Sequence, residues 1–230
     1  MKASRSIFTL LFASSVAVVH LAAQQTNAAQ KSIEEVKAKA EAGDAEFQAE
    51  LGIRYEHGKG VAKDEVEAVK WYRKAAEQNY ALAQYYLGVC YAEGVAKNER
   101  EALFGAARDP AEAVKWYRKA AEQNFAKAQY NLGVCYAEGE GVTQDPVEAV
   151  KWYRKAAEQN NADAQYKLGM CYEYERGVAE DSVEAYKWLL LSARQGDEDA
   201  KAFLTVMESK MLKPKQIAEG QKRAREFKPR

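Results

Sequence analysis

The chain has 230 residues, of which 47% are hydrophobic and 30% charged, and its 34 lysines and arginines balance its 34 aspartates and glutamates. This is the composition of a foldable protein with enough apolar residues to bury a core. A general binder of nucleic acid or of anionic membranes needs clustered positive charge, and the overall balance argues against both. Three cysteines and two histidines, widely spaced, leave little for a metal site.

Residues 1–23 have the pattern of a secretory signal peptide. Lys2 and Arg5 form a basic start, an uncharged apolar run follows, and small residues end the segment at Ala23, with a second possible cleavage point after Ala28. The apolar run of about 13 residues is shorter than the ~20 that a membrane-spanning helix needs. We therefore expect an exported protein, periplasmic or secreted, with no integral span after cleavage. An uncleaved N-terminal anchor is the alternative.

The rest of the chain repeats itself. The word EAVKWYRKAAEQN occurs three times unchanged and once diverged, as EAYKWLLLSARQG, with one tryptophan in each copy. The tryptophans Trp71, Trp116, Trp152 and Trp188 are separated by 45, 36 and 36 residues. A second word, LG-x-x-Y, precedes each copy, starting at Leu51, Leu87, Leu132 and Leu168. A fixed period in the thirties indicates a solenoid of stacked supersecondary units.

Both words have the apolar spacing of helices, so each unit is predicted to be helix A, a loop and helix B. Aspartates three residues before a glutamate predict the N-caps of helices B, at Asp64, Asp145 and Asp181. Pro110 and Pro146 follow aspartates at the first helical position, where a missing N–H costs nothing. Left-handed residues are expected to end helices B, at Asn79, Asn124, Asn160 and Gly196.

A glycine interrupts helix A at the same place in every unit, at Gly52, Gly88, Gly133 and Gly169. A glycine in the middle of a helix costs ~1 kcal/mol relative to alanine. We expect this cost to be offset by close approach of helix B with its bulky tryptophan and tyrosine.

The combined pattern, A-x-x-x-L-G-x-x-Y, then G-x-G-V-x-x-D, then A-x-x-W-Y-x-x-A-A, resembles the Sel-1-like repeat family, which is related to tetratricopeptide repeats. The resemblance covers residues 44–196 and implies an all-α fold, a right-handed α-solenoid, that acts as an adaptor for protein complexes. The expected organisation after the signal peptide is a capping helix (24–43), four repeats (44–80, 81–125, 126–161 and 162–196), and a partial fifth repeat with a C-terminal capping helix (197–230).

The second repeat carries a net insertion of nine residues near 94–109. One interpretation is a tolerated loop or an added helical turn, and the other is a protrusion that contacts a partner through Leu103 and Phe104. The chain's last stretch, 210–230, holds eight basic and two acidic residues. It is predicted to be the solvated face of the capping helix, or else a weak attachment to an anionic envelope surface.

Cys90, Cys135 and Cys171 occupy the same position in three successive helices A. Equivalent positions of stacked units lie roughly 10 Å apart, beyond the ~7 Å that a disulfide allows between Cα atoms. Cysteine-rich secreted relatives of the family pair a cysteine in helix A with one in helix B, where this chain has alanines, at Ala75, Ala120 and Ala156. We expect buried free thiols.

No catalytic motif is recognisable, and the single histidine of the mature chain, His57, stands alone. The sequence therefore predicts a protein that is not an enzyme, with no cofactor and no metal. Its predicted function is to bind a protein or peptide on the concave face of the solenoid, which helices A line in related solenoids. The alternative is a peptidoglycan binder, or a weak β-lactam or cell-wall hydrolase, as suggested for some cysteine-rich relatives.

Two columns of helix A are candidates for this binding surface. The position before the leucine of LG-x-x-Y varies, as Tyr86, Asn131 and Lys167, and is the better candidate for solvent exposure. The position before it is a ladder of tyrosines, Tyr85, Tyr130 and Tyr166. Tyrosines are typical of interaction hot spots, but this ladder could equally be core between the repeats.

Overall fold

The computed structural model describes residues 33–95 and 107–230. The predicted signal peptide and the candidate residues Leu103 and Phe104 lie outside the described residues. Within the described ranges every regular element is helical. None of the helices in these ranges is long and apolar enough to cross a membrane.

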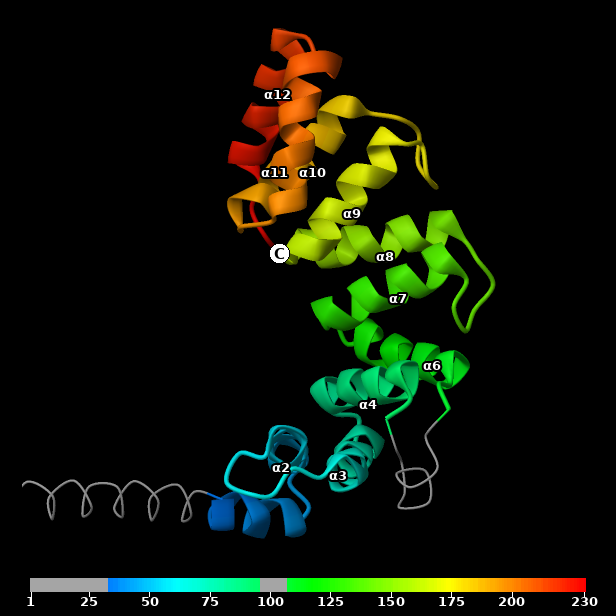
Figure 1. Ribbon diagram of the computed structural model, residues 1–230, viewed down its shortest axis with the longest axis vertical. Coiled ribbons are helices and arrows are strands. Elements are labelled where there is room, and N and C mark those ends of the chain that lie inside the picture. The colour runs from blue at the N-terminus through cyan, green and yellow to red at the C-terminus, as the bar shows by residue number, and fades with distance from the viewer. Residues whose placement is uncertain (1–32, 96–106) are drawn as a thin grey trace, which may run out of the picture.

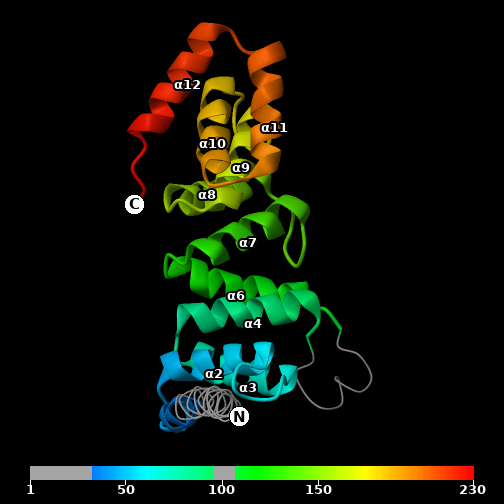
Figure 2. The same cartoon turned by 60° about the vertical axis from the view of Figure 1, so that its left-hand side comes forward.

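The helices form a solenoid that is stacked along the long axis of the molecule (Figures 1 and 2). A short helix at 33–41 comes first. Four pairs follow, each with helix A before helix B: α2 (Ala45–His57) with α3 (Glu65–Glu77), α4 (Ala81–Glu93) with α6 (Pro110–Glu122), α7 (Ala126–Glu138) with α8 (Pro146–Glu158), and α9 (Ala162–Glu173) with α10 (Ser182–Arg194). We call these pairs units 1 to 4. The chain then continues through α11 (Glu198–Val206), a π-helical turn η1 (Met207–Met211) and α12 (Pro214–Glu226).

The local signals that start and end helix B act as the sequence predicts. The side chain of Asp145 accepts hydrogen bonds from the N–H groups of Val147 and Glu148, and Asp64, Asp109 and Asp181 cap their helices in the same way. At the other end Asn79, Asn124 and Asn160 have φ of 63°, 65° and 66°, in the left-handed region. Together these caps set both ends of helix B in units 1 to 3.

The helix-A glycines exist because helix B lies against their backbone. A Cβ atom on Gly133 would lie 2.6 Å from the ring of Tyr153, and Gly52 and Gly88 meet Tyr72 and Tyr117 at the same distance. The predicted close approach is confirmed, and the group responsible is the tyrosine rather than the tryptophan. In unit 4 the contact is made by Leu189, whose Cγ would lie 2.7 Å from such an atom on Gly169.

A ladder of buried glutamines, which the sequence analysis did not identify, joins each unit to the next. Gln84 of α4 donates to the carbonyl of Ala76 in α3 (3.2 Å) and accepts from the side chain of Gln123 in α6 (2.7 Å). The same pair of hydrogen bonds recurs at Gln129 with Ala121 and Gln159, and at Gln165 with Ala157 and Gln195. Gln84, Gln129 and Gln165 are at most 1% exposed, so each ladder member is a buried amide with its partners in place.

Both ends of the stack are covered, as expected for a solenoid. Gln48 of α2 donates to the carbonyl of Ala40 (3.0 Å), the bond that Gln84 makes to the preceding helix B. The helix at 33–41 therefore takes the place of a helix B before unit 1. At the other end α12 begins at Pro214 and buries Ala224 against unit 4.

The insertion in unit 2 leaves the stack undisturbed. The N–H of Asp109 donates to the carbonyl of Tyr91 (2.8 Å), and Asp145 bonds to Tyr136 in the same way (2.9 Å). The helix-B cap of unit 2 thus returns to the position it has in a unit without extra residues.

We predict that Gly133→Ala lowers the free energy of unfolding by about 1–2 kcal/mol. Overpacking against Tyr153 costs about 1–3 kcal/mol, and the better helix propensity of alanine returns up to ~1 kcal/mol. Urea denaturation followed by circular dichroism measures the change. In a Tyr153→Ala background the same substitution should be neutral or stabilising, because the ring is gone. An equal loss in both backgrounds would contradict the contact.

Glu173, at the end of α9, is 9% exposed, and its Oε2 has no hydrogen-bond partner within the described part of the chain. Burial, aided by the nearby Glu180, raises the pKa of its carboxyl group above the ordinary value. The folded state therefore holds this proton more tightly than the unfolded state, and stability falls as pH rises from the unfolded pKa toward the folded one. We predict that Glu173→Gln raises the melting temperature at pH 7 but not at pH 3.5, measured by thermal denaturation. A gain of the same size at both pH values would contradict this assignment.

Candidate protein-binding site at the repeat junctions

Two pockets lie at the loop edge of the solenoid, by which we mean the side where each helix A passes through its loop to helix B. The first, of about 310 Å³, lies at the junction of units 1 and 2. The second, of about 520 Å³, lies at the junction of units 3 and 4. In Figure 1 the loop edge of units 3 and 4 is at the right, where the loops after α7 and α9 project.

The two pockets share a floor. An alanine and a tyrosine of helix B and the cysteine of the next helix A line both: Ala68, Tyr72 and Cys90 in the first, and Ala149, Tyr153 and Cys171 in the second. Each floor tyrosine is the one that packs on the helix-A glycine. The close contact between the helices therefore also shapes the base of each pocket.

The rims of the pockets differ. Around the first pocket stand charged side chains of unit 1 and the end of α4: Glu56, His57, Lys63, Glu65 and Glu93. Around the second stand Glu138, Gln144, Lys167, Glu175 and Arg176. The two pockets therefore share an apolar floor and differ in the charged side chains that surround it.

The variable column lies at these junctions, against the floor tyrosine of the preceding unit. Tyr86 stacks on Tyr72 with ring centroids 5.0 Å apart, and Lys167 lines the second pocket together with Tyr153. Asn131 hydrogen-bonds to Tyr117 at the junction between units 2 and 3.

The tyrosine ladder lies beside this column. Tyr130 packs near Tyr153 (6.1 Å between centroids), Tyr85 packs against Phe125 (5.4 Å), and Tyr166 lines the second pocket. Residues of both columns are half-buried. The two columns fall in the same range of burial, so the expectation that Tyr86, Asn131 and Lys167 form the more exposed column stays a prediction.

Sequence reasoning missed the loop residues of the rims. They come from the stretch between the tyrosine of LG-x-x-Y and the capping aspartate, where the repeats diverge in sequence (EHGKGVAK, AEGEGVTQ and EYERGVAE). Divergence between otherwise near-identical copies was the available signal.

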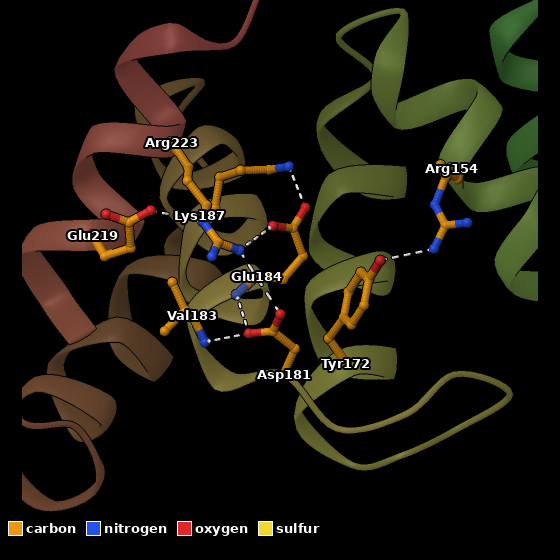
Figure 3. Close-up of polar contacts among 8 residues, drawn as sticks. All are labelled: Arg154, Tyr172, Asp181, Val183, Glu184, Lys187, Glu219 and Arg223. Atoms are coloured by element: carbon orange, nitrogen blue, oxygen red, sulfur yellow. Dashed lines mark hydrogen bonds and ion pairs between the residues drawn. The ribbon is translucent and has the colours of Figure 1, made fainter.

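An arginine of each of the first three helices B connects to the next helix A. Arg154 donates to the hydroxyl of Tyr172 (2.7 Å; Figure 3), and Arg73 and Arg118 donate in the same way to Tyr91 and Tyr136. Because each bond joins two units, it holds the junction at a fixed spacing.

Unit 4 is connected to α12 by ionic contacts instead. Arg223 of α12 lies 3.0 Å from Glu184 and 3.2 Å from Glu219, and Glu184 also pairs with Lys187 (Figure 3). The hydrogen bond to Glu184 raises the pKa of Arg223 above its ordinary value. This arginine of the basic C-terminal stretch is therefore engaged within the protein.

The three cysteines are free and buried, as expected. Burial raises the pKa of the Cys90 thiol to about 12, with Glu56 and Glu93 adding to the shift. Burial also raises the pKa of Cys171, but Arg176 and Lys167 oppose that shift. Among the residues that the structure describes, no group of three or more His, Cys, Asp or Glu side chains could hold a metal ion.

Comparison with known families gives four matches to the Sel1 repeat, at residues 45–80, 81–125, 126–161 and 162–197. The chain belongs to the Sel1 repeat family. Proteins of this family are typically protein-interaction scaffolds, and they are generally non-catalytic. No curated protein matches the chain.

Solved structures of Sel1 repeat proteins have the same fold. A Sel1 repeat protein from Oxalobacter formigenes is 34% identical, with a TM-score of 0.70 over 88% of this chain and 78% of that one. A protective antigen of uropathogenic Escherichia coli with an SLR fold is 33% identical, with a TM-score of 0.56 over 84% of this chain and 47% of that one. The chain thus spans about half the length of the E. coli protein. An immunity protein from Pseudomonas aeruginosa, 22% identical with a TM-score of 0.50 over 89% of this chain and 77% of that one, shares the fold alone.

The opposite charges around the two pocket cysteines predict an order of thiol modification in this Sel1 repeat protein. With a pKa of about 12, Cys90 is on the order of 10⁻⁴ thiolate at pH 8. We expect iodoacetamide at pH 8 to modify Cys171 before Cys90, as followed by peptide mass spectrometry, and all three thiols to react together in 6 M guanidinium. Earlier modification of Cys90 in the folded protein would contradict the assigned electrostatics.

Proposed function

We propose that this protein is an exported, non-catalytic scaffold that binds an extended segment of a partner protein along helices A, with side chains of the partner seated in the loop-edge pockets. The proposal rests on one observation: two junctions between units each have a pocket, and the two pockets have equivalent apolar floors but different charged rims. An extended segment that crosses several units could place one side chain in each pocket. The typical role of Sel1 repeat proteins as protein-interaction scaffolds supports this reading.

The second pocket is the larger of the two, and its rim carries charges of both signs. Its polar side chains include both a basic pair, Lys167 and Arg176, and the carboxylates of Glu138 and Glu175. Tyr174, which precedes the rim residue Glu175 in the chain, is 49% exposed, with its ring 6.1 Å from Phe203. An exposed aromatic beside charged groups is typical of a protein-binding surface.

Export is the second part of the proposal, and it rests on the signal-peptide pattern of residues 1–23. We expect the full chain, produced with its own leader in a Gram-negative host, to be recovered from the periplasm or the medium. Mass spectrometry of the intact protein should show a start at Gln24 or, with the second cleavage point, at Ala29. Recovery of the uncleaved chain in the membrane fraction would contradict export and favour an anchor.

Binding at the loop edge is tested by affinity capture from envelope extract with residues 24–230 as bait. The test variant carries Lys167→Glu and Arg176→Glu, and the matched control carries the same change of charge away from the pockets, Lys127→Glu and Lys222→Glu. We expect a partner protein to be retained by the wild type and the control and to be reduced at least tenfold on the test variant, because two charge reversals act on one rim.

Circular dichroism must show equal folding of all three baits. Capture that is the same on the test variant and the control would contradict a loop-edge site. Recovery of wall fragments in place of a protein would contradict the scaffold and favour the cell-wall alternative.

A further inference from the structure

A second surface lies on the opposite, turn edge of the solenoid, where each helix B passes to the next helix A. In the first three units this edge carries the same three residues, Glu-Gln-Asn, at 77–79, 122–124 and 158–160. Figure 1 shows the last residues of the chain running back to this edge, beside the start of α9. The chain thus lays one of its own extended segments on the turn edge.

Segment 227–230 crosses from unit 4 to unit 3 by three contacts. The backbone of Phe227 is extended (φ −63°, ψ 130°). Its ring meets that of Trp188 edge-to-face, with centroids 5.4 Å apart. The N–H of Arg230 donates to the carbonyl of Glu158 (2.9 Å), and its guanidinium Nη1 lies 3.2 Å from the Glu158 carboxylate. An aromatic ring, a backbone bond and an ion pair together are how a peptide docks on a protein surface.

The repeats provide an internal comparison for this contact. The segments 67–79, 112–124 and 148–160, which include most of α3, α6 and α8, have identical sequences. Glu77 and Glu122 are exposed, but Glu158 is half-buried. Because the local sequence is the same, the difference comes from segment 227–230.

Beside Arg230 the turn edge has a groove that runs toward unit 2. This groove is a cavity of about 390 Å³, lined by Arg230 and by residues of units 2 and 3, among them Glu122, Trp152 and Lys155. The ammonium of Lys155 lies over the Trp152 ring (4.0 Å), so this cation is already engaged. The carboxylate of Glu122 has no ion-pair partner within the described ranges, and it offers the next acidic position along the same line.

Unit 4 differs from the other units where Phe227 packs. The three unchanged copies have a lysine three residues after the tryptophan, and unit 4 has Leu191. Leu191 is 8% exposed and belongs to the same cluster as Trp188, Ala224 and Phe227. Exchange of a cation for an apolar side chain creates an aromatic subsite at this end of the groove.

We propose that the turn edge is a docking surface for an extended peptide of a partner protein in which an aromatic residue is followed three residues later by arginine. The aromatic ring sits on Trp188 and Leu191, and the arginine binds Glu158. Segment 227–230 occupies this surface in the free protein, and the partner's segment displaces it. This surface is separate from the loop-edge pockets.

The test uses a chain that ends at Glu226 and a fluorescein-labelled peptide with the sequence of residues 224–230, AREFKPR. Fluorescence anisotropy should show saturable binding to the shortened chain and at least tenfold weaker binding to the full chain, whose own segment fills the site. A peptide with alanine for the phenylalanine should bind about tenfold more weakly, because the aromatic contact with Trp188 is lost. A scrambled peptide of the same composition should bind about tenfold more weakly, because the spacing between phenylalanine and arginine is lost.

The identical units supply a matched control. In the shortened chain Glu158→Lys should weaken peptide binding at least fivefold, since the ion pair is lost and a repulsion replaces it. Glu77→Lys makes the same change in the same local sequence two units away, and it should leave binding unchanged.

If the shortened chain fails to fold by circular dichroism, the full chain with Phe227→Ala and Arg230→Ala replaces it, since these changes release the segment and keep its length. Absence of binding to a folded variant would overturn the proposal and make the segment a packing cap only. Equal effects of Glu77→Lys and Glu158→Lys, or equal binding of the scrambled peptide, would also overturn it.

Discussion

In units 1 to 3 the structure depends on one contact, the tyrosine of helix B lying against the glycine of helix A. The ring occupies the space that a Cβ atom would fill, so the two helices approach more closely there than any other residue allows. The same ring forms the floor of the loop-edge pockets, and the next helix A packs against it. Packing within a unit, packing between units and the shape of the candidate site therefore share one side chain.

A solenoid needs a second constraint, because nearest neighbours alone must fix the spacing of the stack. The glutamine ladder meets this need at the turn edge with buried amide hydrogen bonds, and the arginine–tyrosine bonds meet it on the helices themselves. A buried amide that lost its partner would be costly, so the ladder favours one register of the units over its alternatives. The same residues recur in each copy because each junction must hold neighbouring units at the same spacing and register.

The two edges of the molecule differ in how much their sequence varies from unit to unit. At the loop edge the sequence diverges between copies above a constant floor, so each junction offers a different set of charges. At the turn edge units 1 to 3 share the residues Glu-Gln-Asn, and unit 4 has Leu191 in place of a lysine where the chain's own segment docks. A surface that varies along the stack suits discrimination between partner proteins.

The sequence by itself determined the repeat, the helix pairs, their caps and the need for close helix contact. The caps depend on local backbone chemistry, as at Asp145 before Glu148 and at Asn160 with its left-handed φ. The repeat and the helix pairs follow from periodic spacing in the sequence. The tertiary structure decided which ring meets Gly133, how the Gln84 amide is hydrogen-bonded, and that Tyr86 and Asn131 contact tyrosines of the preceding unit. It also decided that segment 227–230 returns to α8. These contacts join side chains of different helices or segments, and they depend on the distance and angle at which those elements pack, which spacing along the chain does not encode.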